Sequence, residues 1–319
     1  MIARYAILLF LIITILAIPL GAFLLCRWLL PKRYGRWVGL VLAALLLGMI
    51  PYGIYVGFEK LEVHQMEFAS SDLPEAFDGY RIVQFSDAHV GTYGGSRMVL
   101  LRQLVDNINA QHADAIVFTG DLQNLRPDEL TDKMDILSQL HAPDGVYSIL
   151  GNHDYSIYLD TDEATKAKYS QKTQQYERKM GWQLLMNEHR CICRDSDSIV
   201  IAGMENWGKM KRMPRRGDVR KTMEGVAPSS FVVMLQHDPS CWREKILPEC
   251  HAQLTLSGHT HGGQFAIFGW SPVAFSYDEW KGTTYEGERA LHVSVGAGGL
   301  IPFRLGMSGE IVVITLKKK

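Results

Sequence analysis

The sequence predicts an α/β fold in which two mixed sheets pack face to face with helices on their outer sides, preceded by two apolar helices. Three observations predict it. Strand-like and helix-like segments alternate between residues 81 and 180, which is typical of βαβ units. Strand-like segments predominate from residue 183 onward. Two uncharged runs of 22 residues each occupy most of the first 58 positions.

The two uncharged runs, residues 5–26 and 37–58, are long enough to cross a membrane. As α-helices they would each be roughly 33 Å long, which matches the hydrocarbon core of a bilayer. A signal peptide is the alternative for the first run and a buried helix for the second, but no A-x-A-like cleavage site follows the first run. We therefore expect residues 1–59 to form a two-span membrane anchor and residues 60–319 to form a separate domain.

The short loop between the two runs is strongly basic. It carries Arg27, Lys32, Arg33 and Arg36. The positive-inside rule keeps such a loop in the cytoplasm. The sequence thus predicts an integral protein of the inner or plasma membrane, with its large domain on the periplasmic or extracellular side.

Alternating polarity after the second run predicts an edge strand over residues 61–68. Helices are expected near residues 98–108, where the apolar positions have helical spacing, and near 128–140 and 161–180. The remaining predicted strands are 81–85, 115–119, 146–150, 183–186, 190–193, 198–203, 231–236, 253–257, 290–295 and 310–316.

The overall composition does not indicate a particular binding partner. The chain has 33 Lys and Arg against 34 Asp and Glu, so nucleic acid is not expected as a partner. Cys191 and Cys193 lack the second pair that a zinc motif needs. Both free thiols and disulfides remain open for these two residues and for Cys241 and Cys250.

Residues that bind divalent metals follow five of the predicted strands. One such cluster alone would more often be a helix cap or a turn. Five clusters at successive strand ends predict a single site, because ligands of α/β sheets gather beyond the carboxyl ends of the strands. The candidate ligands are Asp87, His89, Asp121, Asn152, His237, His259 and His261.

Carboxylate, amide and imidazole groups suit ions such as Mn, Fe or Zn. Seven ligands exceed the four of one tetrahedral ion and suit two ions about 3.5–4 Å apart that share a carboxylate. Such a pair can deprotonate a water and neutralise the oxygens of a phosphate. The sequence has no Walker loop and no G-x-S-x-G elbow, which argues against nucleotide-driven phosphoryl transfer and against a serine nucleophile of that type.

The motifs Asp87-Ala-His89, Gly120-Asp121, Gly151-Asn-His-Asp154, His237 and Gly258-His-Thr-His261 resemble, in order and rough spacing, the motif set of calcineurin-like metallophosphoesterases. The resemblance covers about residues 60–319. It is closest to the membrane-associated or exported bacterial branch, which the runs 73–87, 258–264 and 295–304 also resemble.

The resemblance implies a four-layer α-β-β-α sandwich and a hydrolase whose nucleophile is a hydroxide bridging two ions. One ion would be bound by Asp87, His89, Asp121 and His261, and the other by Asp121, Asn152, His237 and His259. His153 would stabilise the phosphate or protonate the leaving group, with Asp154 orienting it. The sequence departs from the family after Gly120-Asp121, where it reads Leu122-Gln-Asn124.

A basic loop bears on the substrate. Residues 209–221 contain seven basic side chains, interleaved with Met210 and Met213 and preceded by Met204 and Trp207. The loop is either solvated or binds an anion such as a phosphate or a lipid headgroup. Together with the anchor, it favours a phosphorylated, lipid-linked or envelope substrate.

Three other functions are weighed. An enzyme like the UDP-2,3-diacylglucosamine pyrophosphatase of lipid A synthesis would need a cytoplasmic site, which conflicts with the predicted orientation. A non-catalytic, membrane-tethered binding protein would be expected to have lost a ligand, and none is lost. A nuclease is disfavoured by the balanced charge and the two spans. The metal, the choice between monoester and diester, and the oligomeric state stay open.

Overall fold

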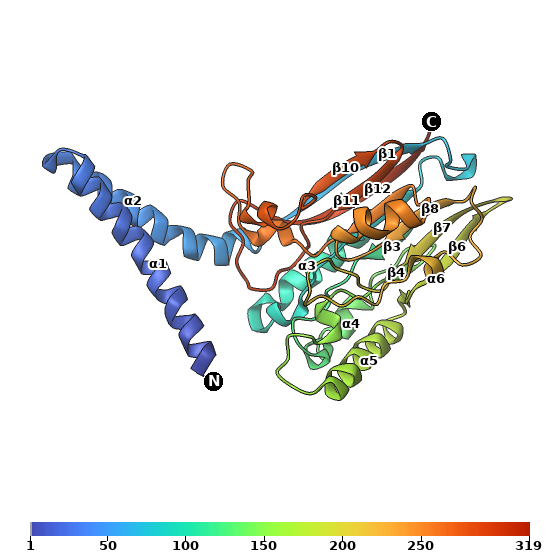
Figure 1. Ribbon diagram of the computed structural model, residues 1–319, viewed down its shortest axis with the longest axis horizontal. Helices are drawn as coiled ribbons and strands as arrows, with labels where there is room; N and C mark the ends of the chain where they lie inside the picture. The colour runs from blue at the N-terminus through green and yellow to red at the C-terminus, as the bar shows by residue number, and fades with distance from the viewer. Residues whose placement is uncertain (1) are drawn as a thin grey trace.

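The computed structural model describes the main chain of residues 2–319 and the side chains from residue 16 onward. Two helices, α1 (Ile2–Leu29) and α2 (Lys32–Tyr52), project from a large α/β domain (Figure 1). Within the described residues, one helical stretch is long and apolar enough to cross a membrane, Lys32–Gly57, and Leu16–Leu29 is a shorter apolar helix. The predicted first span includes side chains 5–15, which lie outside the described ones.

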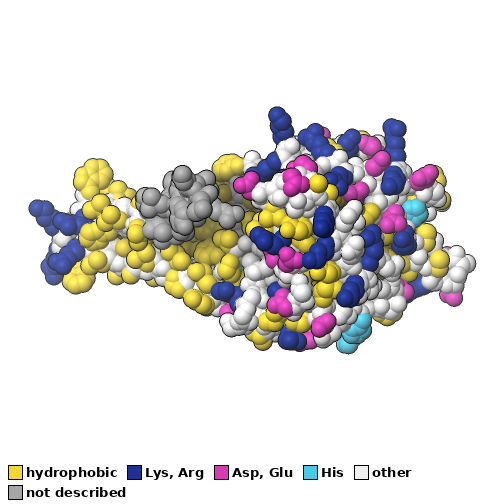
Figure 2. All heavy atoms as spheres, turned by 90° about the horizontal axis from the view of Figure 1, so that it is seen from below, with side chains coloured by type: hydrophobic (Ala, Val, Ile, Leu, Met, Phe, Trp, Pro, Cys, Tyr) yellow, Lys and Arg dark blue, Asp and Glu magenta, His cyan; other side chains and the backbone are white. Residues whose placement is uncertain are grey.

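Helices α1 and α2 approach each other at small residues. A side chain on Gly35 would collide with the main chain at Cys26, and one on Gly39 would collide with Phe23. Glycines spaced four apart at a helix contact are typical of membrane helix pairs. Figure 2 shows the apolar surface of this pair, with Lys and Arg side chains gathered at the tip farthest from the large domain.

Two six-stranded mixed sheets form the centre of the domain and confirm the predicted two-sheet fold. The first sheet has the order β1 (Leu61–Ser70), β12 (Gly309–Lys318), β2 (Arg81–Phe85), β3 (Ala115–Phe118), β4 (Val146–Ser148) and β5 (Gln183–Leu184). The second has the order β10 (Gly282–Glu286), β11 (Arg289–Val293), β9 (Leu254–Ser257), β8 (Phe231–Leu235), β7 (Asp197–Gly203) and β6 (Glu188–Arg194). β1 is an edge strand as predicted. The edge strand β10 was not predicted, because its residues are polar and largely exposed.

Alternation along the strands produces the four layers. On β3, Val117 faces the core between the sheets, whereas Phe118 faces the outer core. Helix α3 (Met98–Asn109) packs on this outer core, and α4 (Met134–Leu137) and α5 (Glu163–Lys179) flank it. On β8, Val233 faces inward and Met234 faces outward against Trp242. The short helices α6 (Val219–Thr222) and α7 (Leu247–Glu249) lie on this second outer side.

The predicted helix over residues 128–140 is mostly absent. The structure has a 3-10 turn at Pro127–Leu130 and the single-turn helix α4. The Glu129 carboxylate accepts N–H groups from Asn124, Leu125 and Arg126, so it holds the preceding loop. Helix α5 matches the prediction for 161–180 and begins with the Asp162 side chain as its N-cap.

A buried arginine fixes the loop over residues 295–304, which contacts the turn after β2. Arg304 is fully buried, and its guanidinium donates to the carbonyls of Val295, Gly296, Gly298 and Ser308. The same loop bonds to the turn after β2, since the Gly298 amide donates to the Asp87 carbonyl. A side chain on Gly298 would collide with the Ala88 carbonyl, which explains this glycine.

Replacing this arginine should destabilise the protein. Arg304→Met leaves four carbonyls without their donor, and each hydrogen bond to a charged group contributes about 1.5–3 kcal/mol. We expect a loss of at least about 3 kcal/mol, which is a fall of roughly 6–12 °C in the melting temperature of a domain of this size. Scanning fluorimetry of the purified full chain measures it. Arg220→Met, at an exposed arginine, is the control, and equal melting temperatures would refute the role of Arg304.

Candidate metal centre

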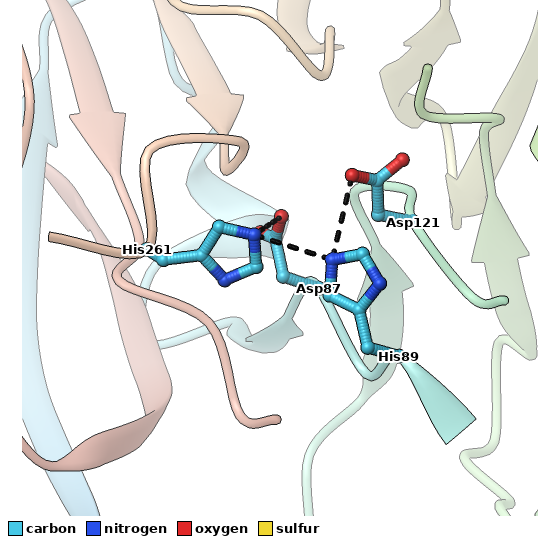
Figure 3. Close-up of side chains that lie close together, drawn as sticks. All are labelled: Asp87, His89, Asp121 and His261. Atoms are coloured by element: carbon cyan, nitrogen blue, oxygen red, sulfur yellow. Dashed lines mark hydrogen bonds and ion pairs between the residues drawn. The ribbon is translucent and has the colours of Figure 1, made fainter. Parts of the chain in front are cut away.

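The structure brings all seven predicted ligands together beyond the carboxyl ends of β2, β3, β4, β8 and β9. Four of them form one compact group, with one donor atom from each lying within 4.8 Å of the others: Asp87, His89, Asp121 and His261 (Figure 3). The two Nε2 atoms of His89 and His261 are 3.2 Å apart. His89 Nε2 lies 3.6 Å from Asp121 Oδ2, and His261 Nε2 lies 3.4 Å from Asp87 Oδ1.

A second group shares Asp121 with the first. It consists of Asp121, His237 and His259. His237 Nε2 lies 3.2 Å from Asp121 Oδ2 and 3.2 Å from His259 Nδ1. It also lies 3.1 Å from Asn152 Oδ1, which adds the amide to this group. Both groups therefore converge on one carboxylate oxygen.

Five of the seven candidate ligands have a left-handed backbone. Their φ angles are Asp87 52°, His89 43°, Asp121 62°, His259 73° and His261 54°. For a residue with a side chain this conformation costs roughly 1–2 kcal/mol, and such strain gathers at functional sites. Backbone hydrogen bonds hold it, since the Asp87 amide donates to the Gly120 carbonyl and the His89 amide to the Asp121 carbonyl. The turns that follow the strands thus direct these side chains toward one another.

Backbone carbonyls set the tautomers of two imidazoles. Nδ1 of His89 lies 3.2 Å from the Gln123 carbonyl, and Nδ1 of His237 lies 2.7 Å from the Thr119 carbonyl. A carbonyl only accepts, so each Nδ1 carries a proton. In the neutral rings each Nε2 then offers its lone pair to the centre, as a metal ligand requires.

Two tyrosines orient the remaining ligands of the second group. The Tyr158 hydroxyl accepts from Asn152 Nδ2 at 2.9 Å, which leaves Oδ1 for the centre. His259 Nε2 lies 2.7 Å from the Tyr277 hydroxyl, which donates to Asp238 Oδ2 at 3.3 Å. Because the Tyr277 hydroxyl donates its proton to Asp238, it can only accept from His259. The His259 ring therefore donates from Nε2 to Tyr277 and keeps a lone pair on Nδ1.

These three supporting residues were not among the predicted site residues. Asp238 directly follows the ligand His237, which is the one signal that the sequence offered. Tyr158 and Tyr277 lie in loops without a motif.

The charges of the site fit a cation. Burial lowers the pKa of His89 to about 3, and burial likewise lowers the pKa of His261, so both rings are neutral. Burial opposes a charge on His237 too, but the Asp121 and Asp87 carboxylates raise its pKa to about 10. The two carboxylates thus attract positive charge to Nε2 beside Asp121 Oδ2, and a divalent ion bound at this position would displace that proton and take over its charge. Carboxylates, an amide oxygen and imidazole lone pairs in two adjoining groups are a donor set that two divalent ions would satisfy.

His153 and Asp154 do not form the predicted pair. The Asp154 carboxylate accepts backbone N–H groups from Gly151, Asp121, Leu122 and Gln123 at 2.8–3.2 Å. It therefore fixes the ligand-bearing loops, because a buried carboxylate is satisfied by several amides at once. His153 Nδ1 instead lies 2.5 Å from the Asn124 carbonyl, which orients the ring. The prediction that Asp154 orients His153 is wrong, and the unusual segment 122–124 performs this task.

The candidate centre lies in a cleft of about 240 Å³. Asp121, Asn152, His153, His259 and His261 line it together with Tyr158, Met210, Arg212, Met213, Val273, Ser276, Tyr277 and Leu300. The basic side chains of the loop over residues 209–221 lie in different places. Arg212 reaches the cleft, whereas Arg215 and Arg216 pack over the rings of Trp207 and Tyr155.

The five cysteines are free in the structure. Cys191 and Cys193 are exposed on β6, so they face solvent together as residues two apart on a strand do.

Comparison with known proteins agrees with this geometry. Residues 80–263 match the model of the family described as calcineurin-like phosphoesterase. A Danio rerio protein named transmembrane protein with metallophosphoesterase domain is 30% identical over 288 residues, covering 87% of this chain and 62% of that protein. The uncharacterized metallophosphoesterase YkuE of Bacillus subtilis (strain 168) is 30% identical over 288 residues, covering 86% of this chain and 94% of that protein. The chain therefore belongs to the calcineurin-like phosphoesterase family and is a metal-dependent phosphoester hydrolase.

Proposed function

We propose that this protein is a membrane-anchored phosphoesterase with two divalent ions, which hydrolyses a phosphate ester, diester or pyrophosphate bond of a lipid-linked or envelope substrate. The observation that carries the proposal is the pair of ligand groups that share Asp121 inside a cleft. One ion would be held by Asp87, His89, Asp121 and His261, and the other by Asp121, Asn152, His237 and His259. When bound, the two ions supply Lewis acidity that activates water and neutralises phosphate oxygens.

His153 is proposed to act on the phosphate side of the cleft. Its Nδ1 proton is held by the Asn124 carbonyl, so Nε2 is the atom left for the substrate. A ring held in this way can hydrogen-bond a phosphate oxygen or deliver a proton to the leaving group.

Arg212 and the apolar lining support the proposed substrate class. Arg212 is a cation at the cleft, and Lys209 Nζ lies 5.6 Å from the centre of the Tyr277 ring. Val273 and Leu300 line the same cleft with apolar surface. A phosphate joined to an apolar group would satisfy both kinds of lining.

Two substitutions should separate chemistry from binding. We expect His153→Ala to lower kcat by about 10²–10⁴-fold, the usual contribution of a positioned acid or base, with little change in metal content. Arg212→Ala should mainly raise KM, because it removes a cation that attracts the phosphate. Steady-state hydrolysis of a chromogenic phosphodiester with Mn²⁺, alongside elemental analysis, measures both. Loss of the metals from His153→Ala, or activity that survives complete chelation, would contradict the assignment.

The anchor is proposed to consist of residues 1–59, with the catalytic domain in residues 60–319. The apolar stretch Lys32–Gly57 supports it, as does the relative named a transmembrane protein. Exposed aromatic side chains occur at both ends of α2, with Tyr34 and Trp37 near the start and Tyr52 and Tyr55 near the end, as in the aromatic belts of membrane helices. The basic tip would lie in the cytoplasm and the catalytic domain on the opposite side.

The native thiols on β6 provide a test of this orientation. A membrane-impermeant maleimide should label Cys191 and Cys193 in intact spheroplasts, because both are exposed on the large domain. The Cys191→Ser/Cys193→Ser variant is the control and should lose most of the label, because Cys250 is only partly exposed and Cys241 is buried. Labelling that requires lysis would place the domain in the cytoplasm, and would favour the alternative of an enzyme like the UDP-2,3-diacylglucosamine pyrophosphatase.

A further inference from the structure

Two loops beside the cleft expose a group of large apolar side chains to solvent. We call this group the apolar rim. Phe268 is fully exposed and Phe275 is 86% exposed. The members of the rim are Ile267, Phe268, Trp270, Phe275, Leu300 and Ile301. An exposed apolar patch of this kind marks a surface that is covered by something else.

The two loops of the rim are joined into one unit. The side chain of Gln264 donates to the carbonyls of Ile301 and Phe303 and accepts from the Leu300 amide. The Ala266 amide also donates to the Leu305 carbonyl. Gln264 itself is buried, so the rim is a built surface and not a pair of independent loops.

The conformation of Phe268 indicates that this residue does not stabilise the chain in water. Ile267 and Trp270 bond to each other across a tight turn whose central residues are Phe268 and Gly269. Phe268 has a φ of 51°, a left-handed conformation that is unfavourable for a bulky residue. A strained and fully exposed phenylalanine gains nothing from the fold, so its apolar ring points to an external apolar partner.

The rim is continuous with the end of α2. The ring of Phe303, between Ile301 and Arg304, lies against Gly53, and the Arg304 amide donates to the Gly53 carbonyl at 3.0 Å. Gly53 directly follows α2, beside the exposed Tyr52 and Tyr55. In Figure 1 the orange loops after β9 lie next to this end of α2. The rim is thus at the level where the proposed span leaves the bilayer.

The same loops form the mouth of the cleft. Leu300 belongs to the rim and also lines the cleft. Val273, Ser276 and Tyr277 line the cleft from the loop that carries Phe275. A bilayer that covers the rim would therefore bring lipid headgroups to the candidate metal centre.

We propose that the apolar rim inserts into the same bilayer as α2, so that the cleft takes the phosphate of an amphiphilic phosphoester directly from the membrane surface. This inference rests on the proposed membrane anchor and narrows the proposed substrate to one that stays in the bilayer while its phosphate is cleaved.

Depth-dependent fluorescence quenching tests the insertion. The full chain is reconstituted into phosphatidylcholine and phosphatidylglycerol nanodiscs with nitroxide-labelled lipids, and one exposed thiol carries an NBD fluorophore. In the test variant this thiol is Phe268→Cys, with Cys26, Cys191, Cys193 and Cys250 replaced by Ser and the buried Cys241 kept. In the control the native Cys193 is the one exposed thiol, on β6 at the sheet edge remote from α2, and Cys26, Cys191 and Cys250 are replaced by Ser. We expect blue-shifted emission and several-fold stronger lipid quenching for the Phe268→Cys label.

Each other outcome has a definite meaning. Quenching equal to that of the Cys193 control overturns the rim proposal. A blue-shifted label that the lipids do not quench shows a protein partner in place of the bilayer, which also overturns it. A chain that fails to enter nanodiscs overturns the anchor and the rim together.

A kinetic arm separates the rim from the catalytic assignment. Phe268→Glu/Phe275→Glu should lower hydrolysis of a vesicle-embedded phosphoester at least several-fold and leave hydrolysis of a water-soluble chromogenic phosphoester unchanged, since neither residue lines the cleft. Equal loss on both substrates, or no loss on either, contradicts the rim proposal. A wild-type chain with neither activity contradicts the proposed function, and the quenching result still decides the rim.

Discussion

The carboxylate of Asp121 is the group on which the rest of the site depends. Its Oδ2 lies within 3.6 Å of both His89 Nε2 and His237 Nε2, and its Oδ1 accepts the His153 amide at 2.8 Å. A buried carboxylate is costly without positive charge or donors around it. Both sheets supply groups around this carboxylate, because the loops after β2 and β3 come from one sheet and the loops after β8 and β9 from the other. The candidate ligands from the two sheets thus surround one shared carboxylate.

The sequence was sufficient to predict that the seven candidate ligands lie together, and insufficient to predict the contacts that hold them in place. Ligands directly follow buried strands, and strand ends are readable from hydrophobic runs. Their supports depend on distant contacts. The Tyr277 hydroxyl that contacts His259 belongs to a loop 18 residues further along the chain. The Asp154 carboxylate accepts backbone amides and does not contact the ring of its neighbour His153. The left-handed turns of Asp87 and His261 carry no local signal, because neither is a glycine. The helix predicted near 128–140 is mostly absent for a similar reason. The sequence does not reveal that the Glu129 side chain accepts the Asn124 amide of the preceding loop.

The apolar helix α2 and the cleft are connected by a short stretch of chain. Arg304 holds the loop that supports Asp87, and the neighbouring Phe303 packs on Gly53 at the end of α2. Leu300 and Ile301 of the apolar rim lie on the same loop, and Gln264 joins this loop to the other part of the rim. A single structural unit thus supports the candidate metal centre on one side and contacts the apolar helix on the other. This arrangement gives a physical reason for the large domain to lie close to the proposed anchor without a flexible linker.

Metal content of the purified full chain tests the shared carboxylate most directly. We expect about two ions per chain, as in other sites with two adjoining metals. His89→Ala and His237→Ala should each lose mainly one ion, because each belongs to only one ligand group, whereas Asp121→Ala should lose both. Asp128→Asn, at an exposed aspartate, is the matched control and should keep both. A wild-type chain that binds one ion, or an Asp121→Ala chain that keeps its full metal content, would contradict a site of two ions that share the Asp121 carboxylate.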